Sequence, residues 1–437
     1  MLGDAGREAA PGLPPLLPPV VRGYWLAMAV LTGLSILYTA AKAMLFHLKF
    51  PYGIGMLYDD SVWGDILVFR PGFVHFRTPQ FWDSFEYPFT YPAPLAVVLG
   101  LLFRFGHPVR IYLMIGAAAI CAAAWWFVRQ LTVRGIASPT AWAFTLSTLA
   151  MTWPLLFLID TANAEGFVIV VLALGVYAVL RERWWLGAIL IGVAGAMKFF
   201  PLILLGLLLA KRRYNEFAAA LIVAFIVTIA SLAYVGPTIA EAQRHIDVGF
   251  ALIQSMYLYT MKPDAAALDH SLWVGVRYAA VYGDRLLHTV SATEQAALIA
   301  ASLRVYLVVA AASGVALFFA KIRHLPLLNM VVALTICAVL LPPLSLEYTL
   351  VHLLLPFALL CAYAIDMGQR SVAVEGLGAC FGCFAVLFNI ETFLSNRFVY
   401  AAEFRTLALL LLLWLVMRHR FPWAALEPIA TERSAIA

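Results

Sequence analysis

Charged residues are scarce in this chain. Among its 437 residues, 12% are charged and 64% are hydrophobic, and the mean hydropathy is +0.90. Soluble domains carry about twice this share of charged residues, so the composition excludes that class. We therefore expect an all-α polytopic membrane protein, because helices satisfy their own backbone hydrogen bonds in lipid.

A concentrated basic patch is also missing. The formal net charge is +5 and the pI is near 8.9, but the Lys and Arg residues are scattered between apolar runs. A nucleic-acid-binding face gathers such residues, so we expect no nucleic-acid partner. Scattered basic residues are typical of the cytoplasmic loops of membrane proteins.

The five cysteines all lie inside apolar runs, which argues against a disulfide framework. Cys380 and Cys383 form a C-x-x-C without polar neighbours or a second ligand pair, so helix packing explains them better than redox or metal chemistry. The sequence has no Walker loop, dinucleotide fingerprint, metal cluster or nucleophile elbow. We therefore expect no metal site and no cofactor, and a soluble nucleotide donor has no support.

A cleavable signal peptide is not evident either. The first twenty residues are proline-rich, and no small-residue cleavage site follows the apolar run that starts at Tyr24. We expect this run to remain as a signal anchor.

Long apolar runs form about twelve candidate membrane crossings. A spanning helix needs about 20 apolar residues, and the positive-inside rule orients each one. The candidates are residues 24–46, 109–128, 140–159, 166–180, 185–197, 199–210, 217–235, 303–320, 325–340, 349–365, 372–393 and 406–417.

Two of these assignments depend on orientation. Basic residues flank both ends of the run 184–210, which is long for one helix, so we expect two short crossings that turn around at Lys198-Phe199-Phe200-Pro201. The run 92–105 is too short to span and is expected to be an interfacial helix on the outer side.

This topology predicts a single membrane domain. Residues 24–420 would form it, between cytoplasmic tails at 1–23 and 421–437. The outer face would receive a large first loop at 47–108, with interfacial helices, and a long loop at 236–302. We expect a multi-pass protein of the cytoplasmic membrane with both termini inside.

Carboxylates, arginines and aromatic residues gather in the stretch 64–94, and Asp65 is its first acidic residue. A carboxylate at the boundary between water and lipid is partly desolvated, which suits a general base that takes a proton from an attacking hydroxyl. The other interpretation is a solvated loop aspartate or a helix N-cap. Asp59 and Asp60 are rival candidates, although adjacent loop aspartates are usually just solvated.

Further candidates surround the same outer face. Tyr91 precedes a proline, so a helix should begin just after it, and its ring would anchor at the interface or contact a sugar or acceptor. Lys198 lies in an apolar context and needs either an anionic ligand such as a phosphate or an internal carboxylate. Asp160 and Asn163 would cap the following helix or bind a ligand.

The segment 341–356 contains Glu347, Tyr348 and His352 after a proline-interrupted turn. An α-helix would place Tyr348 and His352 on one face by their i, i+4 spacing. A lone histidine there is more often a packing residue than a binding group. His270, in the long outer loop, is the last candidate for substrate binding.

Four motifs in order resemble a known family. They are Asp65-Ile66-Leu67-Val68-Phe69, resembling Asp-x-x-Val-Tyr; Pro88-Phe89-Thr90-Tyr91-Pro92, resembling Phe-Thr-Tyr-Pro-Pro; the lysine turn Gly195-Ala196-Met197-Lys198-Phe199-Phe200-Pro201; and Leu341-Pro342-Pro343-Leu344-Ser345-Leu346, resembling Ser-Pro-Ile-Ser-Trp. The chain thus resembles the GT-C superfamily of glycosyltransferases, and most specifically glycosyltransferase family 87, which includes phosphatidylinositol-mannoside mannosyltransferases. It departs from the pattern where Leu346 replaces the Trp and where Tyr348 and Thr349 replace a His-His pair.

The resemblance implies a GT-C-like fold and a function. Asp65 would match the family's catalytic aspartate, and Lys198 would contact the phosphate of a polyprenyl-phosphate sugar in the outer leaflet. The transferred sugar would be mannose or another hexose, and the acceptor a hydroxyl of a lipid or glycan. Polyprenyl phosphate leaves as a stable anion, so one carboxylate base suffices for direct, inverting displacement, whereas glycosidases normally need two.

Two other classes remain open. About twelve crossings with half-length helices near a lysine are also features of a secondary transporter or lipid flippase, although no internal repeat is visible. The altered motif near Glu347 is compatible with a non-catalytic lipid-binding subunit that keeps the fold. Substrate uptake by vesicles without a covalent product would favour the transporter.

Overall fold

The structure, a computed structural model, describes residues 17–46, 64–78, 80–259, 269–287, 292–369, 374–389 and 401–423. These residues form helices joined by short connections, and their one β-type pairing is an isolated bridge between Asp269 and Leu346. The protein is therefore an all-α membrane protein, as the composition predicted.

Five of the described helices are long and apolar enough to cross a bilayer, or six if one bent pair counts as a single span. The five are Pro19–Leu37, Pro108–Val133, Tyr214–Val235, Glu294–His324 and Glu347–Gly368. The bent pair consists of α6, Ser138–Met151, and α7, Trp153–Thr161, which meet at 59°. Pro154 explains the bend, because it lacks a backbone N–H and cannot continue the α6 hydrogen-bond ladder.

Helices occupy most of each predicted apolar segment within the described residues. Several of them are short, however. The 14 residues of α9, Trp184–Met197, or of α16, Leu327–Leu340, reach only about 21 Å along the axis, less than a hydrocarbon core. The number of crossings therefore stays a prediction.

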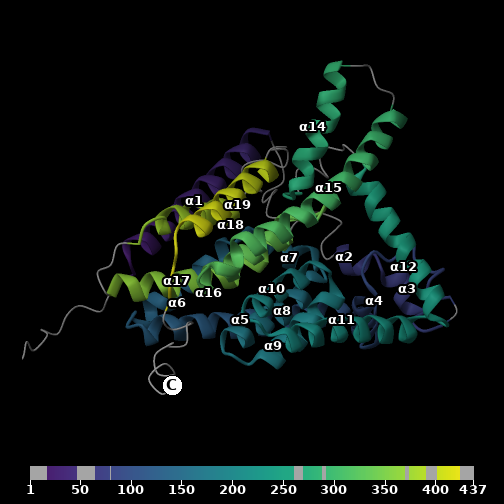
Figure 1. The fold of residues 1–437 in the computed structure, drawn as a ribbon, viewed down its shortest axis with the longest axis horizontal. Helices are drawn as coiled ribbons and strands as arrows, with labels where there is room; N and C mark the ends of the chain where they lie inside the picture. Colours follow the sequence, from purple (N-terminus) through teal and green to yellow (C-terminus); the bar gives the residue numbers. More distant parts are fainter. Residues whose placement is uncertain are drawn as a thin grey trace, which may run out of the picture.

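One group of helices lies toward the N- and C-terminal parts of the chain. It contains α1, Pro19–Phe46; α17, Leu354–Gln369; α18, Leu377–Phe388; and α19, Ala401–Arg418 (Figure 1). Tyr24 of α1 packs against Phe357 and Phe381 of this group. Between it and the rest of the protein runs α16, whose residues are all buried.

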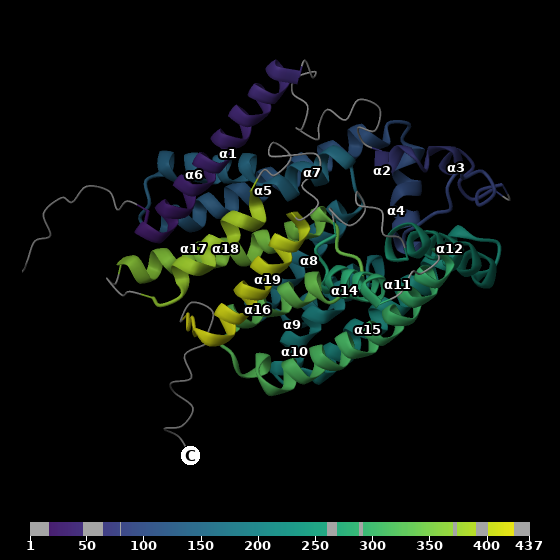
Figure 2. The same ribbon diagram turned by 90° about the horizontal axis from the view of Figure 1, so that it is seen from above.

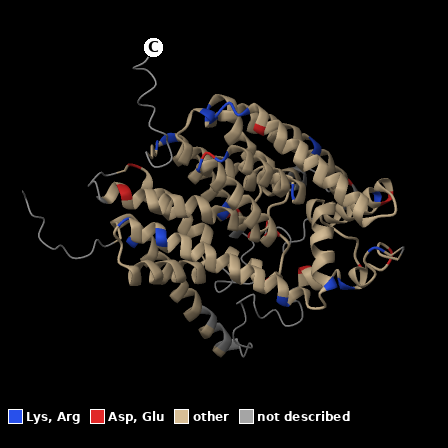
Figure 3. Cartoon of the chain, turned by 90° about the horizontal axis from the view of Figure 1, so that it is seen from below, with Lys and Arg blue, Asp and Glu red and all other residues tan. Residues whose placement is uncertain are grey.

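A second group is built from the middle of the chain. It contains α4, Ala93–Arg104; α5, Pro108–Val133; α8, Glu165–Leu180; α9; and α11, Tyr214–Val235 (Figure 2). Small residues let these helices approach closely: a Cβ on Gly192 of α9 would lie 2.5 Å from the Ala220 carbonyl oxygen of α11. Lys and Arg residues lie mostly at helix ends and turns (Figure 3).

Lys198 interrupts the run 184–210 where the sequence predicted a turn. Helix α9 ends at Met197, and Lys198 is extended, with φ −150° and ψ 143°. The 3₁₀ helix η2, Phe200–Leu205, then packs back onto α9, and α10, Gly206–Ala210, follows it. Lys198 therefore lies in a short break between two helices.

The predicted interfacial helix exists as α4, which begins directly after Pro92. Before it come two short helices, α2, Gly64–Leu67, and α3, Arg70–Val74. A cluster of phenylalanines fixes them against α4, with Phe73 stacked on Phe103 at 5.0 Å. The position of α4 relative to the bilayer remains a prediction.

The segment 236–302 is more helical than a loop. It holds α12, Ile239–Ile253; the π-helical turn η3, Gln254–Leu258; and α14, Leu272–Leu287. Helix α15, Ala292–Ala320, begins well before residue 303, where the crossing was predicted to start. That boundary was wrong because hydropathy alone missed an alanine-rich stretch with high helix propensity.

Candidate active site

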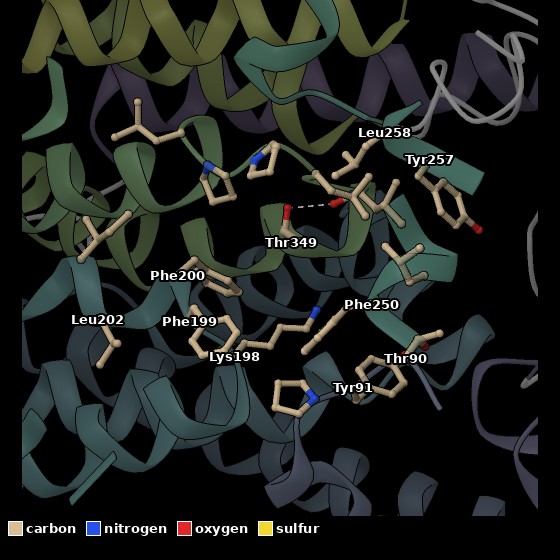
Figure 4. Close-up of a pocket in the computed structure, with 18 of the residues that line it drawn as sticks. Thr90, Tyr91, Lys198, Phe199, Phe200, Leu202, Phe250, Tyr257, Leu258 and Thr349 are labelled. Carbon is tan, nitrogen blue, oxygen red and sulfur yellow. Dashed lines mark hydrogen bonds between the residues drawn. The ribbon is translucent and has the colours of Figure 1, made fainter. Parts of the chain in front are cut away.

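A cavity of about 1540 Å³ is lined by residues of α11, α12, α15 and α16 and of the connections between helices. Its walls come from distant parts of the chain: α2, the residues before α4, the Lys198 turn, η3, α15 and the turn 341–349. Figure 4 shows Lys198 extending away from Phe199 into this space, toward Phe250, with Tyr257 on the opposite wall.

Asp65 lines this cavity and is held by Asn163. The side-chain amide of Asn163 donates a hydrogen bond of 2.6 Å to Asp65 Oδ2 and approaches the Tyr91 hydroxyl at 3.2 Å. All three residues line the cavity. The Asn163 amide therefore holds the Asp65 carboxylate near the aromatic ring of Tyr91.

A tight turn between α7 and α8 places Asn163. Ala162 adopts the left-handed conformation, with φ +50°, and ends α7. The Asn163 side-chain oxygen then accepts a hydrogen bond from the Glu165 backbone N–H at the start of α8. The Tyr112 hydroxyl donates to the Asn163 carbonyl oxygen at 2.9 Å. Asn163 thus accepts a hydrogen bond at the start of α8 and also lines the cavity, and its binding of a ligand stays a prediction.

Burial raises the pKa of the Asp65 carboxyl above its usual value, while the Asn163 hydrogen bond and the Lys198 charge oppose that shift. A carboxylate with a raised pKa is a stronger base than one in water. Its ionised form is favoured by hydrogen bonds from Asn163 and Thr161 and by the charge of Lys198. These are the electrostatic conditions that a general base requires.

Lys198 has an internal carboxylate partner. Its ammonium group pairs with Glu165, a fully buried side chain whose other oxygen lies 2.6 Å from His352 Nε2. The ammonium also lies over two aromatic rings, 6.0 Å from the centre of Tyr91 and 5.1 Å from that of Tyr348. Cation–π attraction of this kind helps to hold a lysine at an apolar wall.

Away from these polar groups the cavity is a long apolar channel. Its lining continues along α15 from Leu307 through Gly314 to Phe319, and on to Ile322. On α15 alone this is about 18 Å of helix. The opposite side is made by η2, α10 and α16, with Leu202, Leu209 and Cys337 among the lining residues.

The predicted common face of Tyr348 and His352 is wrong in its geometry. Residues Glu347–Leu353 form a 3₁₀ helix, in which positions three apart align instead of four. Tyr348 lines the cavity, whereas His352 lies behind the wall against Glu165.

Several other candidates do not line the cavity. Glu347 accepts hydrogen bonds from Trp153 and from Arg405 of α19, so it ties helices together. His270 is fully buried and lies 3.2 Å from the hydroxyls of Ser345 and Thr349. Asp160 is buried elsewhere. Asp59 and Asp60 lie outside the described residues.

Three residues of this region were not predicted from the sequence. Glu165, the partner of Lys198, is a carboxylate that heads an apolar helix, and that position alone signals a need for a cation. Asp247 and Tyr257 reach the cavity from the segment 236–302. Only the tertiary fold brings them there. No group of three His, Cys, Asp or Glu side chains among the described residues is arranged to hold a metal ion.

Comparison with known proteins identifies the family of the chain. The model of glycosyltransferase family 87 matches residues 89–345, more than half of the sequence. Over 158 residues the chain is 34% identical to a polyprenol-phosphate-mannose-dependent alpha-(1-2)-phosphatidylinositol pentamannoside mannosyltransferase of Mycobacterium tuberculosis (strain CDC 1551 / Oshkosh), and this match spans 35% of each protein. No solved structure matches. The family match covers the cavity walls from Thr90 to Leu344, and the chain belongs to glycosyltransferase family 87.

Proposed function

We propose that this protein is an integral membrane glycosyltransferase that moves a hexose, such as mannose, from a polyprenyl-phosphate donor to a hydroxyl of a lipid or glycan acceptor. The observation that carries the proposal is the position of Asp65. This partly desolvated carboxylate lies at the polar end of a cavity whose remaining length is apolar. Such a cavity fits a ligand with one charged end and one hydrocarbon end.

Asp65 acts as the general base. It takes the proton of the acceptor hydroxyl while the acceptor oxygen attacks the anomeric carbon of the donor sugar. The bond from that carbon to the phosphate oxygen breaks, and polyprenyl phosphate leaves with the electron pair. One displacement inverts the configuration at the anomeric carbon.

Lys198 stabilises the leaving phosphate. Its ammonium lies between the Tyr91 and Tyr348 rings, on the cavity wall near Asp65. Negative charge grows on the phosphate oxygen as the bond breaks, and a preorganised cation there lowers the barrier. Glu165 keeps the ammonium in place before the donor binds.

The apolar channel holds the polyprenyl chain. Apolar side chains of α15, η2 and α16 line it. Holding the donor along this channel brings its phosphate to Lys198 and removes most of the orientational freedom that a bimolecular reaction would otherwise lose at the barrier. The acceptor then enters beside Asp65.

The site would face the outer side of the cytoplasmic membrane. The residues of its polar end, Asp65, Tyr91 and Lys198, all belong to segments whose flanking basic residues predict an outer location. The multi-pass architecture is consistent with this orientation.

Transfer from a labelled donor tests the function. Protein in nanodiscs is incubated with polyprenyl-phosphate mannose and with lipids extracted from the host envelope, and products are identified by mass spectrometry. Asp65→Asn should lower kcat by about 10²- to 10⁴-fold. Asp83→Asn is the matched control, because that aspartate is exposed and does not line the cavity. Full activity of folded Asp65→Asn protein would eliminate the assigned base, and uptake without a covalent product would indicate a transporter.

A further inference from the structure

One cavity wall is a π-helical turn. Helix α12 ends at Ile253, and the five residues of η3 continue it with wider winding. Such turns are rare and occur frequently at functional sites, because they redirect side chains that a regular helix would aim elsewhere. Gln254, Met256, Tyr257 and Leu258 of this turn all line the cavity.

Tyr257 contributes a hydroxyl group to that wall. No hydrogen bond from the described residues reaches its hydroxyl, although the residue is half-buried. Burial raises the pKa of this hydroxyl, and the negative charge of Asp65 raises it further. Tyr257 and Asp65 line the same cavity, and the hydroxyl stays protonated and able to donate.

Arg277 of α14 does not line the cavity but forms a hydrogen bond to the π-helical turn. Its guanidinium is fully buried and donates to the Tyr257 carbonyl oxygen. Its Nε and Nη2 atoms have no partner among the described residues. The negative charges of Asp269 and Glu403 act on this buried guanidinium and offset part of the cost of burying it. Among the described residues, its one hydrogen bond goes to Tyr257, whose side chain lines the cavity.

Different walls of the cavity suit different parts of the ligand. Lys198 and its flanking rings suit the phosphate, and Asp65 suits the acceptor hydroxyl. A neutral phenol has little to offer a phosphate that already has a lysine. It is well suited to a sugar, which presents hydroxyl groups and apolar ring faces together.

Resting on the proposed function, we propose that Tyr257 donates a hydrogen bond to a sugar hydroxyl bound beside Asp65, and that Arg277 is the positioning residue that holds Tyr257 there. Both the donor sugar and a glycan acceptor offer such a hydroxyl. The kinetic arms of the test distinguish them.

The first arm compares Tyr257→Phe with Tyr259→Phe. Tyr259 follows on the same segment, approaches Gln254 at 3.2 Å and does not line the cavity. We expect Tyr257→Phe to raise one KM about three- to tenfold with kcat nearly unchanged, since a neutral hydrogen bond is lost. A rise in the donor KM assigns the bond to the transferred sugar, and a rise in the acceptor KM assigns it to the acceptor. Tyr259→Phe should change neither.

The second arm tests Arg277 through Tyr257. Arg277→Gln should raise the same KM, but it should add nothing when Tyr257→Phe is already present. Thermal unfolding of each variant in detergent confirms that it is folded, and Arg277→Lys replaces Arg277→Gln if the latter is not. Additive effects in the double variant would overturn the role of Arg277.

The outcomes separate this inference from the proposed function. Transfer by the unmodified protein together with unchanged KM values in Tyr257→Phe overturns the inference alone, and so does an equal effect of Tyr259→Phe. Absence of transfer by the unmodified protein, with every native envelope lipid supplied, overturns both.

Discussion

The side-chain amide of Asn163 donates a 2.6 Å hydrogen bond to Asp65, a residue 98 positions earlier in the chain. The same side chain accepts from the backbone of Glu165, which in turn pairs with Lys198. The proposed base and the proposed phosphate-binding lysine are therefore joined through one turn, residues 162–165. A substitution in this turn should therefore affect both Asp65 and Lys198.

Removing the Asn163 amide should shift the pH dependence of transfer. Its hydrogen bond lowers the pKa of Asp65, so in Asn163→Ala burial raises that pKa without this opposition. Asp65 works as a base only when deprotonated, so the acidic limb of the kcat/KM profile should move to higher pH. A hydrogen bond to a charged group is worth about 1.5–3 kcal/mol, or about one to two pH units.

The exposed Asn215→Ala provides the comparison for this measurement. The profile should be recorded with saturating acceptor over the range in which both variants remain folded. An acidic limb that stays in place in Asn163→Ala would contradict the assignment of that limb to Asp65.

Glu165→Gln should destabilise the protein through Lys198. The substitution leaves the lysine in an apolar wall without its carboxylate partner, and breaking such a buried pair costs about 3–5 kcal/mol. Lys198→Met added to Glu165→Gln removes the stranded charge, so the double variant should unfold at a higher temperature than Glu165→Gln alone. Thermal unfolding in one detergent measures both, and additive losses would show that the pair is not coupled.

Much of this site was predictable because its residues conflict with their surroundings. Lys198 stands alone in an apolar run, and Asp65 opens a polar stretch next to one. Each conflict signals a residue that needs a partner or a ligand. The helix start after Pro92 and the helix end at Met197 follow from proline and from the lysine break, both of which are local.

The remainder depends on contacts that no local pattern encodes. Sequence spacing predicted that His352 would share a face with Tyr348, but the segment winds as a 3₁₀ helix and places His352 against Glu165. Tyr257 carries no signal in the sequence, because its importance comes from a π-helical turn and from Arg277, twenty residues later.

Narrowing the apolar channel should select against long donors. Gly314 lines the channel on α15, and a Cβ there would lie 2.9 Å from the Leu341 side chain. A leucine at this position occupies space that the polyprenyl chain needs, so Gly314→Leu should raise the KM of a long-chain donor by about tenfold or more. A donor with two or three isoprene units should be affected much less.

Ala312→Leu is the matched control for the channel, because Ala312 is exposed on the same helix and does not line the cavity. Equal losses for short and long donors in Gly314→Leu would indicate a general disturbance of α15 instead of a channel for the polyprenyl chain.

The segment that carries Tyr91 should depend on one glycine. A Cβ on Gly249 of α12 would lie 1.8 Å from the Phe89 carbonyl oxygen, which is backbone and has no rotamer to change. Gly249→Ala must therefore push α12 away from residues 89–91, at a cost of about 1–3 kcal/mol, typical of overpacking. Gly275→Ala on α14 is the opposite case, because nothing lies within 4 Å of a Cβ there. Alanine has the higher helix propensity, so this substitution should stabilise the protein by up to about 1 kcal/mol. Unfolding temperatures that fall in the first variant and hold or rise in the second would confirm the contact, and a neutral Gly249→Ala would show that α12 does not fix the Tyr91 wall.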